Sequence, residues 1–150
     1  MLSPYRVIDL SNEMGILCGQ MLADLGADVI QVEPPGGSSA RQTGPWLDDV
    51  PGPERSLFWW AYSRNKRSLV VDLGTEEGQG VFAKLATTSD VLITNVREPA
   101  LSKLGQSYEQ VCHHCEDIIW VGVTAFGPDG PYAGRPGIDF LAQGYAGMIS

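Results

Sequence analysis

A run of four potential metal ligands, Cys-His-His-Cys at residues 112–115, is the first feature of the sequence that could carry chemistry. A structural zinc site would need a second ligand pair at a suitable spacing, and the rest of the chain offers only Cys18 as a thiol. On a helix, four consecutive side chains also point around the axis and do not converge on one ion. A haem attachment motif would require histidine where Glu116 stands. We therefore predict no metal site.

The elements that would position functional groups alternate between strands and helices. Short β-branched runs indicate strands, and apolar residues spaced by three and four indicate helices. Strands are expected at residues 5–10, 29–33, 68–73, 90–94 and 117–123, helices at 14–27, 75–86 and 108–115, and an aromatic helical or turn segment at 56–63. This alternation predicts an α/β domain with a Rossmann-like, doubly wound, mostly parallel sheet.

The carboxyl ends of the strands are where such a sheet binds ligands. Those ends fall at residues 11–15, 34–38, 72–74, 95–97 and 124–127. A dinucleotide-dependent oxidoreductase would show G-x-G-x-x-G after the first strand, but the chain reads Ser-Asn-Glu-Met-Gly-Ile there, which sets that class aside.

Two segments lack the regular alternation. Residues 34–53 are rich in Pro, Gly, Ser and Asp and are predicted to form an extended loop without a regular element; loops of that length are usually functional. Residues 138–150 form an apolar, helix-like stretch that ends without a cap, so we expect the chain to be truncated.

The charge balance limits the partners of the chain. With 10 basic and 18 acidic residues the net charge is -8, which argues against nucleic acid or an anionic membrane as the main partner. A small anionic ligand stays open, because a few local cations and backbone N–H groups can hold phosphates. No apolar run is long enough to cross a bilayer, and three cysteines do not make a disulfide framework, so we expect a cytoplasmic protein.

Five ordered motifs resemble those of the class III CoA-transferases, the CaiB/BaiF family. They are "LADLGADVIQVEPPGG" from Leu22, "RNKRSLVVDL" from Arg64, "SDVLITNVRE" from Ser89, "LGQSYEQV" from Leu104 and "AFGPDGPYAGRPGIDFLAQ" from Ala125. The resemblance covers the whole chain. It implies that residues 1–150 are the N-terminal part of a CoA-binding, Rossmann-like large domain, whose small domain and catalytic segment lie beyond residue 150. Members of the family form interlinked homodimers.

The resemblance also implies a reaction. In this family an aspartate attacks the carbonyl of an acyl-CoA thioester, giving a mixed anhydride and CoA thiolate, and CoA passes to a carboxylic acid acceptor. That aspartate lies in a Gly-Asp segment expected beyond Ser150, so no catalytic residue is assigned here and the fragment alone is expected to be inactive. Asp139 is interpreted as structural, because the family does not use this position as the nucleophile.

Two alternative functions stay open within the resemblance. Racemases of the superfamily carry Gly-His-Asp where this chain has Gly137, Ile138 and Asp139. The absence of that histidine favours CoA transfer over an acyl-CoA racemase or isomerase. The other alternative is a non-catalytic fragment that binds CoA weakly or not at all.

The residues implied to bind CoA follow four of the five strands. They are Met14 and Gly15 in the first turn, Val71, Asp72, Leu73 and Gly74 toward the adenine, Asn95, Val96 and Arg97 at the switch point, Lys103 toward the phosphates, and Thr124, Ala125, Phe126 and Gly127 along the pantetheine path.

Purely structural roles stay open for several of these residues. Met14 could be an ordinary core residue, Val71 to Gly74 an ordinary strand end, and Lys103 a solvated surface lysine. Many relatives carry an arginine after Glu33, where this chain has Pro34, and Arg41 could substitute from the loop. The charged residues of 65–68 could brace the loop without touching ligand.

Overall fold

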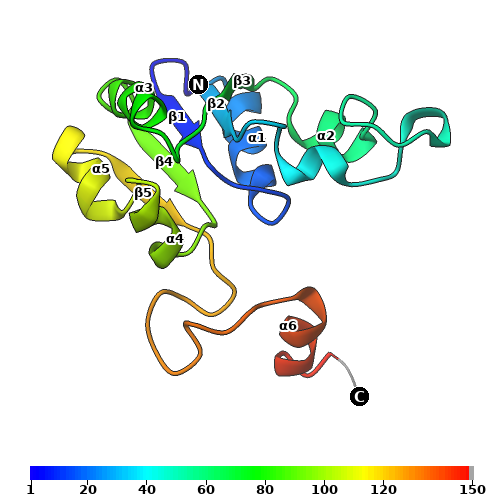
Figure 1. The fold of residues 1–150 in the computed structure, drawn as a ribbon. Coiled ribbons are helices and arrows are strands. Elements are labelled where there is room, and N and C mark those ends of the chain that lie inside the picture. The colour runs from blue at the N-terminus through cyan, green and yellow to red at the C-terminus, as the bar shows by residue number, and fades with distance from the viewer. Residues whose placement is uncertain (149–150) are drawn as a thin grey trace.

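The computed structural model describes residues 1–148 as a sheet flanked by helices, followed by a loop and a last helix that lie to one side (Figure 1). In chain order the elements are β1 (Arg6–Asp9), α1 (Ile16–Asp24), β2 (Asp28–Glu33), α2 (Leu57–Tyr62), β3 (Arg67–Val70), α3 (Glu76–Ala86), β4 (Val91–Thr94), α4 (Glu98–Lys103), α5 (Tyr108–His114), β5 (Ile119–Gly122) and α6 (Asp139–Tyr145). No helix in this described part is both long and apolar enough to cross a membrane.

The sheet has the order β3-β2-β1-β4-β5, and every pairing between these strands is parallel. The prediction of a doubly wound α/β sheet is therefore confirmed, with a fully parallel sheet in place of a mostly parallel one. Ile8 in the central strand lies opposite Ile30 on one side and Leu92 on the other. Because the chain moves outward in one direction from β1 to β3 and in the other from β1 to β5, the switch point lies between β1 and β4.

The two faces of the sheet are covered by different helices. On one face Ile8 and Leu92 pack with Phe82 of α3 and Val111 of α5. On the other face the neighbouring residues of the same strands pack against α1, mainly around Ala23. Alternate side chains of a strand point to opposite faces, so each strand contributes to both cores.

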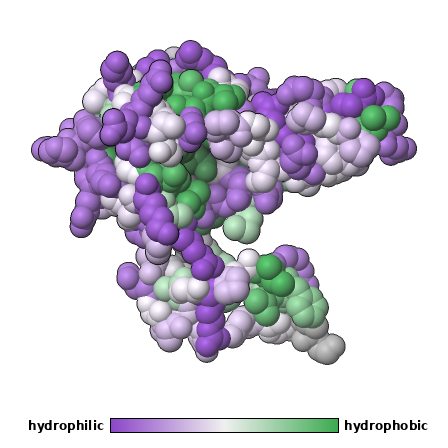
Figure 2. Space-filling model, in the orientation of Figure 1, coloured by the Kyte–Doolittle hydropathy of each residue, from purple (hydrophilic) through white to green (hydrophobic). Residues whose placement is uncertain are grey.

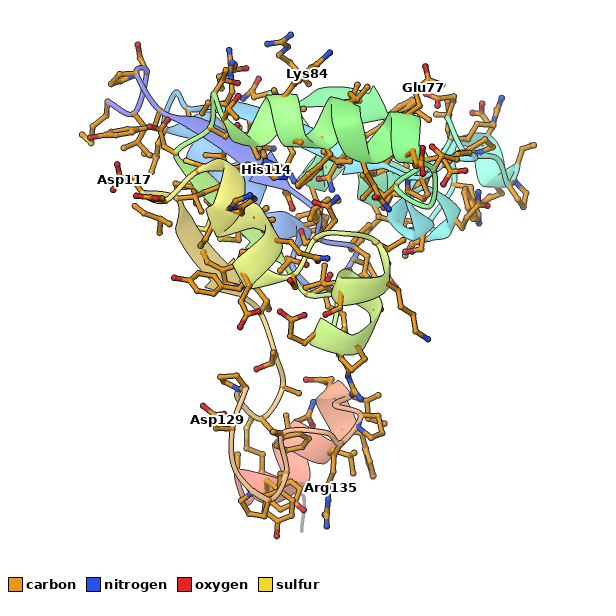
Figure 3. All side chains as sticks on the ribbon, turned by 60° about the vertical axis from the view of Figure 1, so that its left-hand side comes forward. Glu77, Lys84, His114, Asp117, Asp129 and Arg135 are labelled. Atoms are coloured by element: carbon orange, nitrogen blue, oxygen red, sulfur yellow. The ribbon has the colours of Figure 1, made fainter. Side chains whose placement is uncertain are left out.

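Local signals determine where the helices begin and end. The Thr75 hydroxyl accepts a hydrogen bond from the Gly78 N–H at 3.1 Å and caps α3. Glu77 in the first turn of α3 and Lys84 in the last have the signs that the helix dipole favours (Figure 3). At α5, Ser107 and Gln110 form a reciprocal capping box.

The structure differs from the predicted elements in three places. Helix α4 was not predicted, because its six residues with Pro99 near the start are too short to show a period. The loop expected at residues 34–53 contains two 3-10 helices, Ser39–Gln42 and Leu47–Asp49, so the prediction of no regular element was wrong there. In the stretch predicted as helical from 138 to 150, α6 covers Asp139–Tyr145, and the last two positions lie outside the described residues.

Candidate functional site

Three connected hollows cross the carboxyl ends of the strands, and together we call them the groove. The first hollow, about 250 Å³, lies by β2 and β3; its lining comprises Leu10, Val32, Glu33, Pro34, Val71, Asp72, Leu73, Gly74, Val96, Leu101 and Leu104. The second, about 480 Å³, lies over β4 and β5, and includes Thr94, Val96, Arg97, Leu101, Trp120, Thr124, Gly127 and Ala133. The third, about 300 Å³, lies toward α6, and includes Met14, Asn95, Arg97, Thr124, Ala125, Arg135, Ile138 and Asp139.

The hollows adjoin one another, because neighbouring hollows share lining residues. Val96 and Leu101 line both the first and the second hollow. Arg97 and Thr124 line both the second and the third. The groove thus runs from β3 past the switch point to the loop that follows β5, which is where an open parallel sheet binds its ligand.

The turn between β1 and α1 forms one wall of the groove. Met14 is 65% exposed and lines the third hollow, so its interpretation as a core residue was wrong. Gly15 is buried just before α1 and lines none of the three hollows. A Cβ on Gly15 would lie 2.7 Å from the Cβ of Ser11, so glycine is needed for the turn to close.

The end of β4 is joined to this turn across the switch point. The backbone N–H of Asn12 donates to Asn95 Oδ1 at 3.1 Å, and the Asn95 amide nitrogen donates in return to Asn12 Oδ1. Thr94 is buried and its hydroxyl accepts from the Val96 N–H at 3.1 Å, which fixes the backbone as it leaves the sheet. The two turns therefore form one hydrogen-bonded unit at the centre of the groove.

Arg97 holds the loop that follows β5. Its guanidinium donates to the carbonyl oxygens of Gly134 at 2.9 Å and Arg135 at 2.8 Å. The Arg135 guanidinium lies 4.3 Å from the ring centroid of Tyr132, in the loop seen at the bottom of Figure 3. A Cβ on Gly137 would lie 1.9 Å from the Cβ of Ala125, so this glycine allows the loop to fold back over the groove.

The other predicted pantetheine contacts divide between the groove and an aromatic cluster. Thr124, Ala125 and Gly127 line the groove, but Phe126 does not. The Phe126 ring lies 6.1 Å from that of Tyr132 and 5.8 Å from that of Tyr145, centroid to centroid, and so packs the loop against α6. Much of α6 remains exposed and apolar, as the lower part of Figure 2 shows.

The segment after β3 forms the floor of the first hollow. Val71 and Leu73 are half-buried, and Asp72 Oδ1 accepts from the Gly74 N–H at 2.9 Å, which closes the turn. Leu101 is buried on the opposite wall. Lys103 is exposed at the end of α4 and lines none of the three hollows.

Arg41 was expected to be able to replace a phosphate-binding arginine, and the structure gives it another role. Its guanidinium donates to both carboxylate oxygens of the fully buried Glu33, at 2.6 and 2.9 Å, and lies 4.1 Å from the Trp59 ring centroid. Burial raises the pKa of Glu33, but hydrogen bonds from Arg41, the Ser68 hydroxyl and the Ser38 N–H outweigh it, and the pKa lies below its usual range. Arg41 therefore stabilises the loop beside the groove.

A buried ion pair under the first turn is a feature that the motifs did not reveal. Lys66 Nζ lies 2.8 Å from Asp9 Oδ2, with the two side chains 1% and 0% exposed. Burial lowers the pKa of Lys66, and the Asp9 carboxylate opposes that shift. The only sequence signal was that a lysine stands within the specific "RNKRSLVVDL" motif.

The Cys-His-His-Cys run lies away from the groove. Cys112 and Cys115 are half-buried against the core, and the rings of His113 and His114 are 5.8 Å apart. The two histidines line a hollow of about 560 Å³ between α3 and α5, and Figure 3 shows His114 above the loop that carries Arg135. Within residues 1–148, no three His, Cys, Asp or Glu side chains are grouped so that they could hold a metal.

The parallel sheet defines a Rossmann-like α/β protein, with a groove across the switch point at the strand ends. Residues 2–150 match the model of CoA-transferase family III, and the chain belongs to this family.

Several curated relatives share this segment. The chain is 42% identical over 153 residues to the succinate–glutarate CoA-transferase of Agrobacterium fabrum, covering 99% of the chain and 38% of the relative. It is 39% identical over 147 residues to a subunit of the succinyl-CoA:(R)-benzylsuccinate CoA-transferase of Thauera aromatica, covering 98% of the chain and 36% of the relative. The crystal structure of a CaiB/BaiF family protein from Brucella suis aligns with a TM-score of 0.87 at 37% identity, covering 97% of this chain and 39% of that chain. The chain thus spans well under half the length of these relatives.

Proposed function

We propose that this chain is the CoA-binding part of an enzyme that transfers CoA from an acyl-CoA thioester to a carboxylic acid. The row of adjoining hollows across the switch point carries the proposal. CoA is a long molecule with an aromatic base, a charged phosphate region and a narrow pantetheine arm. A row of three hollows with different linings is suited to such a ligand.

Together the linings of the three hollows support one orientation of CoA, with the base in the first hollow and the pantetheine arm in the third. The first hollow is mostly apolar and ends in the backbone of residues 72–74, which suits a flat base with hydrogen-bonding edges. Arg97 lies at the middle, and Lys103 is exposed on the adjoining helix, so both can contribute positive charge toward phosphates. Thr124 and Ala125, with small side chains, line the third hollow, where the pantetheine arm would reach the reacting end.

The proposed reaction follows from the family. An aspartate carboxylate bonds to the thioester carbonyl carbon, the carbon–sulfur bond breaks, and sulfur leaves with its electron pair as CoA thiolate. A mixed anhydride of the aspartate and the donor acyl group remains. The thiolate then attacks the aspartyl carbonyl and the donor acid leaves, which gives an aspartyl-CoA thioester. The acceptor carboxylate attacks that thioester and expels the thiolate, and the thiolate attacks the acceptor carbonyl of the second anhydride, which forms the new acyl-CoA and frees the aspartate. We place the nucleophile beyond Ser150, and propose that the whole protein is a cytoplasmic homodimer with a second, small domain.

One observation favours CoA transfer over racemisation. Ile138 lines the third hollow at the position where racemases carry histidine, and its side chain can neither remove nor return a proton. Asp139, beside it, accepts a hydrogen bond at 2.5 Å from Gln143 one turn later in α6, as expected for a structural carboxylate.

Thermal unfolding in the presence of CoA tests the binding part of the proposal. CoA at about 100 times its dissociation constant should stabilise the chain by about 2.7 kcal/mol. That corresponds to a rise of about 5–10 °C in melting temperature for a chain of this size. No rise at millimolar CoA would contradict the proposal.

A bulky substitution at the junction of two hollows tests the location. Val96→Trp should fill the groove where the first and second hollows meet and abolish the CoA-induced rise. The matched control is Val81→Trp, at a position on α3 that is 40% exposed and lines none of the groove. If Val96→Trp folds and still responds to CoA like the control, CoA does not occupy this groove.

A further inference from the structure

A network of three buried side chains lies directly beneath the turn between β1 and α1. Lys66 Nζ donates to Asp9 Oδ2 at 2.8 Å, to the Ile16 carbonyl at 2.8 Å and to Gln31 Oε1 at 3.0 Å. These three bonds use all the donors of the ammonium group. Asp9 and Gln31 are at most 1% exposed, so the network is closed to solvent.

The network makes three of its four remaining bonds to Ser11, the first residue of that turn, and the fourth to the Asp9 carbonyl at the end of β1. Asp9 Oδ1 accepts from the Ser11 N–H at 2.9 Å and from the Ser11 hydroxyl at 2.5 Å. Gln31 Nε2 donates to the carbonyls of Ser11 at 2.8 Å and Asp9 at 3.1 Å. Together with the bond from Lys66 to the Ile16 carbonyl, these contacts fix both ends of the turn, at Ser11 and at Ile16.

The turn is also a wall of the groove. It carries Met14, which lines the third hollow, and Asn12, which is bonded to Asn95 across the switch point. A chain of contacts therefore leads from Lys66 through Asp9 and Ser11 to the groove, although Lys66 itself lines none of the hollows.

Stability alone does not account for a buried ion pair at this place. Replacing such a pair by apolar side chains of similar volume is often neutral or stabilising, because both charges lose their hydration when buried. The packing also leaves little freedom, since a Cβ on Gly19 would lie 2.0 Å from Asp9 Oδ2. What an apolar cluster could not supply is the set of hydrogen bonds to the turn.

We propose that Lys66, with Asp9 and Gln31, is a positioning residue for CoA binding: the network fixes the turn of residues 11–16 in the shape that the groove requires. This inference rests on the proposed function, because it assigns the network to the same CoA site. Lys66 acts through the turn and does not touch the ligand.

The main test is the double variant Lys66→Met/Asp9→Asn, which removes both charges together and leaves no unpaired buried ion. The matched control is Arg67→Met/Asp28→Asn, which removes an ion pair of 3.2 Å whose side chains are 69% and 29% exposed, together with the 2.8 Å pair that Asp28 forms with Arg6, both outside the network. A milder variant, Gln31→Met, removes the two carbonyl bonds and the bond from Lys66 Nζ to Gln31 Oε1, and leaves the ion pair intact.

Two measurements separate positioning from general stability. The dissociation constant for CoA, from titration calorimetry, should rise about tenfold or more in the double variant and less in Gln31→Met. A tenfold rise corresponds to about 1.4 kcal/mol, which is comparable to the loss of one hydrogen bond. Hydrogen exchange without ligand should accelerate at residues 11–16 and not in α3. The unfolding midpoints of both network variants should differ from that of the unaltered chain by no more than the midpoint of the control variant does.

The outcomes distinguish this inference from the proposed function. Unchanged exchange at residues 11–16 in both network variants would overturn the positioning role. Accelerated exchange with CoA affinity equal to the control's would overturn its link to binding. If the unaltered chain does not bind CoA, the proposed function fails and the inference fails with it; faster exchange would then leave only a role of the network in shaping the turn.

Discussion

Replacing Arg41 by methionine should destabilise the chain far more than the loss of an exposed ion pair does. Glu33 is fully buried and Arg41 is 13% exposed, so the substitution leaves a carboxylate without its cation in a place that water does not reach. Removing one partner of a buried pair costs about 3–5 kcal/mol. Ser68 and Ser38 still donate to Glu33, which reduces the loss, whereas the lost contact between Arg41 and Trp59 adds to it. Because these two effects oppose each other, we expect a loss of unfolding free energy of about 3–5 kcal/mol.

Urea unfolding followed by tryptophan fluorescence measures this effect. With a denaturant slope of about 2 kcal/mol per molar, the midpoint should fall by about 1.5–2.5 M. The matched control is Arg55→Met, whose ion pair with Asp48 is 38% and 72% exposed and should be worth less than about 1 kcal/mol. The double variant Arg41→Met/Glu33→Gln should recover part of the loss, because it removes the unpaired charge. Equal midpoints for the Arg41 and Arg55 variants would refute the reasoning.

The remaining predictions concern two glycines of α3 and the loss of stability at low pH. Gly78→Ala should destabilise by about 1–3 kcal/mol, because its Cβ would lie 1.8 Å from the Asp72 carbonyl oxygen, whereas Gly80→Ala, with no atom within 4 Å of its Cβ, should stabilise by about 0.5–1 kcal/mol. Urea midpoints compare the two, and stabilisation by both would mean that the turn at Asp72 does not pack on α3. The lowered pKa of Glu33 means that its contribution is fully present above about pH 4.3, the ordinary value in the unfolded chain, and is lost as the pH falls through the folded value. Glu33→Gln should therefore make stability less dependent on pH in this range, and an unchanged acid profile would show that Glu33 is not ionised in the folded chain.

The course of the backbone was largely predictable from the sequence. The β-branched runs around Ile8 and Leu92 and the periodic segment ending near Ala86 carry their signals within a few residues, and the structure has strands and helices there. Helix α4 could not be predicted in this way, since it is short and is stabilised by Leu101, which packs into a site made by distant parts of the chain.

The roles of individual side chains could not be predicted in the same way. Arg41 was open as a replacement for a phosphate-binding arginine and instead pairs with Glu33. Met14 was open as a ligand contact or as a core residue, and it lies exposed at the groove. The position of each side chain depends on the path of its loop, and the path of a loop produces no periodic pattern in the sequence.

By itself the sequence determined the family, the parallel α/β architecture and the strand ends where a ligand would lie, because motifs and periodicity are properties of short segments. Only the tertiary structure decided that the Lys66 ammonium lies against Asp9 and that Asn95 pairs with Asn12. These pairs join residues 57 and 83 positions apart, and they meet because β1 lies between β2 and β4. Strand order brings them together, and no local pattern in the chain records that order.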